Sequence, residues 1–276
     1  MSSSYILSIT TFIYGLAAVL YIGSWIFKKP FAAKAAFAAS FIGFLTNTAG
    51  FTARWAESYQ IGFGHAPLSN MYESLVFFAW CVTAIYLFLE YRHKLKAVGA
   101  FVMPLAFLVM AYASLQNDQI QPLIPALKSN WLIAHVITCF LGYAAFAVAF
   151  VLSVMYLIKK KDAQTPDGAL SLFPDLSDID ELTYRMTLFG FLFLTVGIIT
   201  GAVWANSAWG RYWGWDPKET WSLITWLIYA TLLHARIIWR WSGGRIAFFS
   251  ILGFAAVLFT YLGVNYLPGL HSYGAG

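Results

Sequence analysis

Apolar runs alternate with short polar breaks along the whole 276-residue chain. Eight of these runs approach or exceed the roughly 18–20 residues that a helix needs to cross a bilayer. They lie at about 4–27, 31–52, 70–90, 97–114, 131–157, 184–206, 219–240 and 246–267. The pattern predicts an all-α, polytopic membrane protein that forms a single integral membrane domain over residues 1–276.

The breaks between the runs are mostly basic or rich in glycine, as in "SGG" at 242–244. The longest connector, 158–183, holds six of the twelve acidic residues, so we expect a polar surface loop there. The first run, Tyr5 to Phe27, follows no basic segment and precedes no small-residue cleavage site. It therefore predicts a retained helix and not a removed signal peptide.

The basic residues predict the orientation of the chain in the membrane. An even number of spans places both termini on the same side, and thirteen of the 17 Lys and Arg residues then share the opposite face. These are Lys28, Lys29, Lys34, Arg92, Lys94, Lys96, Lys159, Lys160, Lys161, Arg185, Arg236, Arg240 and Arg245. Because basic residues are enriched in cytoplasmic loops, we expect both termini to be extracytoplasmic.

Composition excludes several classes of protein. The chain is 60% hydrophobic and only 11% charged, whereas soluble domains carry about 25% charged residues. The basic surplus therefore indicates membrane orientation and not nucleic-acid binding. Two cysteines, Cys81 and Cys139, lie inside apolar runs, and no CxxC occurs. The chain is thus not a c-type cytochrome, and any thiol reduction must come from another protein.

A tryptophan-rich segment at about 207–218 interrupts the apolar pattern with the sequence "WGRYWGWDPKETW" (209–221). Tryptophans at a span end either form an interfacial belt or offer a flat surface for a planar ligand. The end of the segment is typical of a helix start, with Asp216 at the N-cap, Pro217 at N1 and Glu219 at N3 of a capping box.

Topology brings two histidines to the face of this segment. His135 lies about five residues after the expected span start at Asn130, and His271 follows the last span. Two neutral imidazoles beside a flat aromatic surface are suited to haem, which takes two axial nitrogen ligands. Either histidine alone is also compatible with simple solvation. The candidate counter-charges for haem propionates on this face are Arg54, Lys128, Arg211 and Lys218.

The remaining histidines differ in their surroundings. His234 follows Asp216 by eighteen residues, about 27 Å along a helix, and an ionisable residue inside a span is a functional candidate by default. It shares a helical stripe with Thr220, Leu223 and Leu227. His65 lies in an outer loop and His93 in a basic inner loop.

The stretch 204–236, "WANSAWGRYWGWDPKETWSLITWLIYATLLHAR", closely resembles the tryptophan-rich WWD signature of haem-handling membrane proteins. Its "PKETW" continuation is similar to the CcsA (ResC) family, the membrane core of the System II cytochrome c synthase. The related CcmC and CcmF branches diverge after the Asp. Three further stretches agree: "GHAPLSNMYESL" at 64–75, "SNWLIAHV" at 129–136 and "GVNYLPGLHSYG" at 263–274.

The resemblance implies a cytochrome c haem lyase subunit of a bacterial cytoplasmic or thylakoid-type membrane, with its active face extracytoplasmic. It implies that haem b is carried outward and joined covalently to the CxxCH thiols of apocytochrome c. His135 and His271 would ligate the iron and act in the reaction, and His234 would handle haem within the membrane. The fellow ligand of His234 would come from a ResB/CcsB-type partner subunit.

The resemblance also implies that the tryptophan segment lines the haem. The expected haem-contacting residues are Trp209, Tyr212, Trp213, Trp215, Asp216 and Pro217. We expect His271, on the C-terminal tail, to be the ligand that the CxxCH histidine displaces. Two alternatives remain at this point: a haem exporter or chaperone without lyase activity, and a cation- or quinone-linked membrane protein with an ordinary aromatic belt.

Overall fold

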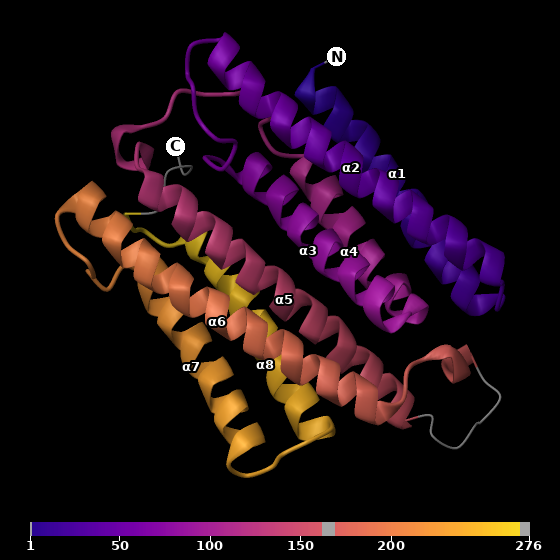
Figure 1. Ribbon diagram of the computed structural model, residues 1–276. Coiled ribbons are helices and arrows are strands. Elements are labelled where there is room, and N and C mark those ends of the chain that lie inside the picture. Colours follow the sequence, from indigo (N-terminus) through magenta and orange to yellow (C-terminus); the bar gives the residue numbers. More distant parts are fainter. Residues whose placement is uncertain (1, 162–168, 271–276) are drawn as a thin grey trace. The chain divides into compact units, whose positions relative to one another are not determined.

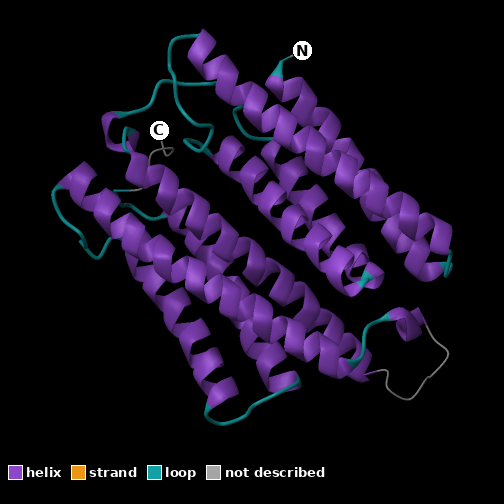
Figure 2. Ribbon diagram, viewed as in Figure 1, coloured by secondary structure: helices purple, strands orange, loops and turns teal. Residues whose placement is uncertain are grey.

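The computed structural model describes residues 2–161 and 169–270, and these residues form helices and connecting segments without a strand (Figures 1 and 2). The eight α-helices are α1 (Ser3–Ile26), α2 (Pro30–Gln60), α3 (Met71–His93), α4 (Lys96–Ala113), α5 (Asn130–Lys161), α6 (Leu176–Trp209), α7 (Pro217–Ile237) and α8 (Gly244–Tyr261). Three short 3-10 helices are η1 (Pro125–Leu127), η2 (Ala169–Leu172) and η3 (Gly263–Tyr266). The predicted all-α, polytopic membrane fold is confirmed.

Six segments are both long and apolar enough to cross a membrane: α1, α3, α4, α5, α6 and the α8–η3 segment. The helices α2 and α7, with 31 and 21 residues, also have the length but are the least apolar of the eight. Each carries charged residues, among them Arg54 and Glu57 in α2 and Lys218 and Glu219 in α7.

Several helices extend beyond the expected spans. The expected polar loop at 158–183 is wrong at both ends, because α5 continues to Lys161 and α6 already begins at Leu176. Its first turns contain Asp180, which forms an ion pair with Arg236 of α7, and Glu181, which forms one with Arg185. Similarly, α2 continues to Gln60 and not 52. The expected spans ended where charged residues interrupt the apolar run. The helices continue past these positions, where the charged side chains form ion pairs.

The described helices group into two compact units, each considered separately. The first contains α1 to α4 with η2, and the second contains α5 to α8 with η1 and η3. The expected single domain over residues 1–276 stays a prediction.

In the first unit, two buried carboxylates are held by neighbouring helices. Glu73 of α3 accepts a 2.8 Å hydrogen bond from the Arg54 guanidinium of α2. Glu90, near the other end of α3, accepts hydrogen bonds from the hydroxyls of Tyr21 and Tyr86. Since a buried polar group costs free energy unless it is paired, these contacts fix the packing of α1 and α2 on α3.

In the second unit, glycines allow α5 and α6 to approach closely. A Cβ atom on Gly142 of α5 would lie 3.0 Å from the Gly190 carbonyl oxygen of α6. A Cβ atom on Gly197 would lie 2.6 Å from the Cys139 sulfur of α5. Small residues at a membrane helix interface let the backbones meet, so that van der Waals contact and hydrogen bonds hold the pair.

The helices α7 and α8 complete the second unit. Thr225 of α7 and Thr260 of α8 share a 3.0 Å hydrogen bond, and the rings of Phe146 and Tyr229 stack with centroids 3.6 Å apart. At its C-terminal end, α8 contacts α5, where the Tyr261 ring packs edge-on against Phe140 at 5.3 Å. These contacts bring the ends of α5, α7 and α8 together beside the tryptophan segment.

Replacing Glu73 by alanine should destabilise the protein by about 3–5 kcal/mol, because it leaves a buried arginine charge without its carboxylate. The measurement is the free energy of unfolding of the detergent-solubilised protein. The control is Arg185→Gln, which breaks an ion pair whose arginine side chain is 59% exposed. That control should cost less than about 1 kcal/mol, and equal losses in the two variants would contradict the role assigned to the buried pair.

Candidate functional site

His135 is held by a hydrogen bond across the α5–α6 interface. Its Nδ1 atom lies 2.7 Å from the Gly197 carbonyl oxygen. A carbonyl oxygen only accepts, so Nδ1 is the donor and the neutral ring keeps its lone pair on Nε2. A hydrogen bond of this kind fixes both the tautomer and the direction of a histidine ligand. His135 therefore offers Nε2 for coordination.

The faces of the His135 ring are packed against α6. The ring stacks on the Trp204 indole, with centroids 5.9 Å apart and planes 14° from parallel. A Cβ atom on Gly201 would lie 2.6 Å from His135 Nδ1, so only glycine leaves room for the ring there. Gly197, Gly201 and Trp204 follow at helical spacing and line one face of α6.

Trp204 is a site residue that the sequence prediction missed, although it begins the WWD-like stretch. It is 3% exposed, and its indole N–H donates a 2.9 Å hydrogen bond to the Ala126 carbonyl oxygen in η1. Its spacing from Gly201 and Gly197 places all three residues on one face of the helix. This spacing is the sequence signal that could have identified Trp204. Trp204 also contacts Trp209, with ring centroids 4.8 Å apart. It thus joins His135 to the tryptophan segment.

The tryptophan segment itself forms a tight turn around Glu219. The carboxylate of Glu219 accepts hydrogen bonds from the backbone N–H groups of Gly214 (2.7 Å) and Asp216 (3.1 Å). Between them, Trp215 adopts a left-handed backbone with φ +58. This conformation costs a non-glycine residue about 1–2 kcal/mol, and the two hydrogen bonds to Glu219 maintain it.

This turn presents aromatic side chains outward. The Trp215 side chain is 68% exposed and Tyr212 is 59% exposed. Trp213 packs edge-on against Trp215, with centroids 5.8 Å apart and planes at 90°. An exposed, rigid aromatic surface of this kind is suited to the face of a planar ligand.

Asp216 connects the tryptophan segment to the C-terminal tail. The expected capping box is confirmed: one Asp216 oxygen accepts from the Lys218 N–H at 3.0 Å, and the Glu219 side chain accepts from the Asp216 N–H. The other Asp216 oxygen accepts from the Leu270 N–H at 2.6 Å. Leu270 is the last described residue, so His271 and its predicted role lie outside the described residues.

The predicted counter-charges differ in their accessibility. Lys218 lies near the site: its ammonium group is 3.4 Å from the Asn265 side-chain oxygen and within electrostatic range of His135. Lys128 and Arg211 are exposed. The expectation for Arg54 is wrong, because that guanidinium is buried in the first unit and paired with Glu73. Asn265 was not predicted, since a polar residue after a span carries no distinctive signal.

His234 lies on an exposed face of α7. Its ring packs against Trp239 in a T-shaped arrangement, with centroids 5.4 Å apart. Leu227, from the same predicted stripe, is 50% exposed. His234 and Leu227 therefore lie on a surface of the second unit that a partner can reach.

His65 has a structural position in the first unit. It is 6% exposed, and its ring nitrogens lie 3.0 Å and 2.9 Å from the carbonyl oxygens of Ala66 and Gln121. These contacts join the segment after α2 to the segment after α4.

Comparison with known proteins gives one consistent family. The family described as Cytochrome C assembly protein matches residues 68–271. The Cytochrome c biogenesis protein CcsA of Guillardia theta is 45% identical over 243 residues, covering 80% of this chain and 79% of that protein. The protein of the same name from Gloeobacter violaceus is 38% identical over 324 residues, covering 97% and 93% respectively.

A solved structure, Cytochrome c Heme Lyase CcmF, has the same fold. It superposes with a TM-score of 0.72 at 19% identity, over 95% of this chain and 47% of the CcmF chain. The chain therefore corresponds to about half of that larger protein, and the likeness concerns the fold alone.

Gly201→Ala should destabilise the second unit by about 1–3 kcal/mol, because the added methyl group overlaps the His135 ring. Unfolding of the purified protein in detergent measures this. The matched control is Gly23→Ala in α1, where a Cβ atom meets nothing within 4 Å. The control should be neutral or stabilising by up to about 1 kcal/mol. A Gly201→Ala protein as stable as the control would show that the ring has room to move.

Asp216→Ala should release the C-terminal tail, because it removes the acceptor for the Leu270 N–H together with the helix cap. Amide hydrogen exchange in residues 263–270 should become faster by roughly five- to tenfold, as expected for the loss of about 1 kcal/mol. Asp178→Ala, which removes an exposed carboxylate from the first turn of α6, is the control. Unchanged exchange in Asp216→Ala would refute the proposed anchoring.

Proposed function

The chain belongs to the CcsA family of cytochrome c biogenesis proteins, and from that premise we propose that it is a haem lyase subunit. In this proposal it binds haem b between His135 and His271 and joins it to the CxxCH thiols of apocytochrome c. The observation that carries the proposal is the hydrogen bond from His135 Nδ1 to the Gly197 carbonyl oxygen, which leaves Nε2 free to ligate iron.

The described residues beside His135 are suited to haem, a planar iron complex. Trp204 and Gly201 hold the imidazole in one orientation, so little freedom is lost when iron binds. The aromatic surface of Trp213 and Trp215, with Tyr212 and Trp209, would cover the porphyrin. Lys218 supplies a cation that complements a haem propionate.

Asp216 would control the second ligand. It holds the N–H of Leu270, the residue before His271, at the N-terminus of α7. The tail is thereby restrained one residue before the proposed ligand. We assign His271 as the ligand that the CxxCH histidine displaces.

The chemistry that this site would perform is an addition. Each cysteine sulfur forms a bond to one vinyl carbon of haem, and the thiol proton ends on the other carbon of the former double bond. This addition needs no external oxidant or reductant, provided that the two cysteines are present as reduced thiols. The protein's contribution is to hold the vinyl groups and thiols at reacting distance in one orientation, which is catalysis by positioning.

His234 would serve a separate step within the membrane. Because it lies on an exposed face of α7, a ligand from a ResB/CcsB-type partner subunit can complete its coordination. The basic residues favour an orientation with His234 towards the cytoplasm and the tryptophan segment outside. Haem would thus pass outward, and a separate thiol-reducing protein would supply the reduced apocytochrome.

The first test is the absorption spectrum of the purified protein. The wild type should carry haem with a low-spin spectrum typical of two nitrogen ligands, and His135→Ala with His271→Ala should lose that spectrum. His93→Ala, which changes an exposed histidine at the end of α3, is the control and should leave it intact. A colourless wild type, or a double variant that keeps the spectrum, would refute haem ligation at this site.

Covalent attachment needs a second measurement. The protein is co-expressed with its partner subunit and an apocytochrome c, without other assembly factors, and covalent haem is detected on a denaturing gel. The lyase proposal requires covalent haem with the wild type and its loss with His135→Ala. Haem bound to the wild type without covalent product would instead identify a haem exporter or chaperone.

A further inference from the structure

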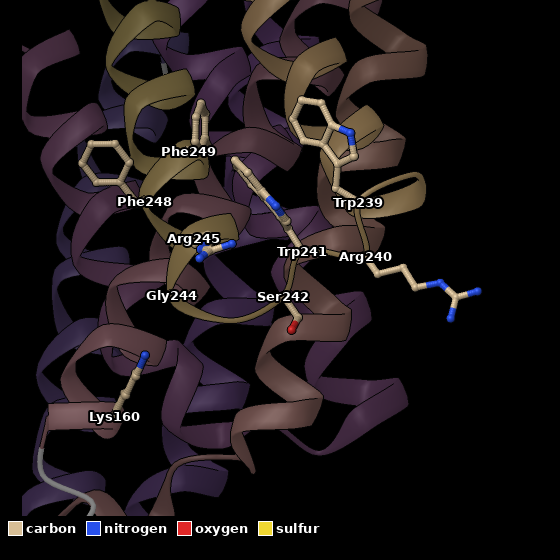
Figure 3. A pocket seen from close by; sticks show the side chains of 9 residues that line it. All are labelled: Lys160, Trp239, Arg240, Trp241, Ser242, Gly244, Arg245, Phe248 and Phe249. Carbon is tan, nitrogen blue, oxygen red and sulfur yellow. The ribbon is translucent and has the colours of Figure 1, made fainter.

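A pocket of about 970 Å³ lies where the C-terminal end of α5, the turn after α7 and the start of α8 meet (Figure 3). Four aromatic side chains and three cationic side chains line it, and none of its lining residues is acidic. The pocket is at the end of α7 remote from the tryptophan segment. Its lining therefore takes no part in the site around His135.

Two of the cations, Lys160 and Arg245, lie at the first turn of α8 (Figure 3). The Lys160 ammonium group lies 3.3 Å from the position that a Cβ atom on Gly244 would occupy. The Arg245 guanidinium lies over the Trp241 ring at 5.3 Å from its centroid. Arg240 also lines the pocket, but its guanidinium points away from the other two cations (Figure 3). Figure 3 shows Lys160 and Arg245 near the start of α8. The helix N-terminus adds partial positive charge to theirs, so the pocket favours an anion.

A carboxylate beside the start of α8 is already engaged. Asp180 of α6 accepts a 2.7 Å hydrogen bond from the Gly243 N–H and a 2.5 Å ion-pair contact from Arg236. Its charge is therefore balanced by Arg236 and does not neutralise Lys160 or Arg245.

The aromatic residues give the pocket an apolar side that continues along α8. Trp239 is 55% exposed and Phe248 is 61% exposed. From Phe248, exposed apolar residues follow at Leu252, Ala255 and Phe259, a spacing that keeps them on one face of the helix. A ligand with an anionic head and long apolar chains matches this arrangement.

We propose that the pocket binds the phosphate headgroup of an anionic membrane lipid, with its acyl chains along the exposed face of α8. Lys160, Arg245 and the first N–H groups of α8 contact the phosphate, and Trp239 and Phe248 flank the start of the chains. These cations belong to the set that is predicted to face the cytoplasm, where the membrane surface is anionic. The inference does not depend on haem binding at His135.

The test is native mass spectrometry of the full-length protein in detergent, with phosphatidylglycerol or phosphatidylethanolamine added. The wild type should retain phosphatidylglycerol in preference to phosphatidylethanolamine. Lys160→Gln with Arg245→Gln should weaken phosphatidylglycerol binding by roughly tenfold or more, because each cation at a membrane surface contributes severalfold. Equal binding of the two lipids, or unchanged binding by this variant, would overturn the proposal.

Two further variants separate the site from general charge and from misfolding. Lys34→Gln with Arg92→Gln removes two exposed cations outside the pocket and should bind as the wild type does. Lys160→Arg with Arg245→Lys keeps both charges and should also retain the lipid. A loss of equal size in the Lys34/Arg92 variant would reduce the effect to overall charge and contradict the proposal.

Two competitors test the nature of the ligand. Inorganic phosphate in millimolar excess should leave bound phosphatidylglycerol in place, because it lacks the chains that contact Phe248 and α8. Complete displacement would assign the pocket to free phosphate instead. Haemin that binds in a Lys160- and Arg245-dependent manner and excludes phosphatidylglycerol would likewise overturn the lipid assignment.

Discussion

The geometry of the candidate site depends on the close approach of α5 and α6. In lipid, helices gain little from hydrophobic burial, so their association relies on small residues and interhelical hydrogen bonds. Gly197 and Gly201 have no side chain that would keep the two backbones apart, and the Gly197 carbonyl oxygen accepts an interhelical hydrogen bond from His135. The same interface that holds the helices together therefore also selects which imidazole nitrogen carries the proton.

Further contacts in the second unit connect His135 to the tryptophan segment and to Leu270 of the C-terminal tail. Trp204 stacks on His135 and touches Trp209, and Glu219 then holds the turn that begins after α6. Asp216 links that turn to Leu270. Side chains from widely separated parts of the chain thus meet through a series of direct contacts. A hydrogen bond and ring packing position the histidine, and hydrogen bonds to Glu219 hold the turn that carries Trp215.

Much of this architecture could be predicted from the sequence. Apolar length placed the helices, and the Asp-Pro-Lys-Glu pattern placed the start of α7, because both depend on local chemistry. The early start of α6 could not be predicted, since it depends on Asp180 meeting Arg236 from another helix. Asn265 and the buried state of Arg54 were missed for the same reason. Their roles arise from partners far away in sequence, which apolar periodicity does not report.

The left-handed backbone at Trp215 sets the direction in which the tryptophan segment presents this indole. Glu219 binds the N–H groups on both sides of this residue, so the indole can reorient only through its own side-chain torsions. The backbone from Gly214 to Asp216 is consequently held in one conformation. Inserting even one amino acid between these two residues would misalign the exposed indole while every tryptophan remained present.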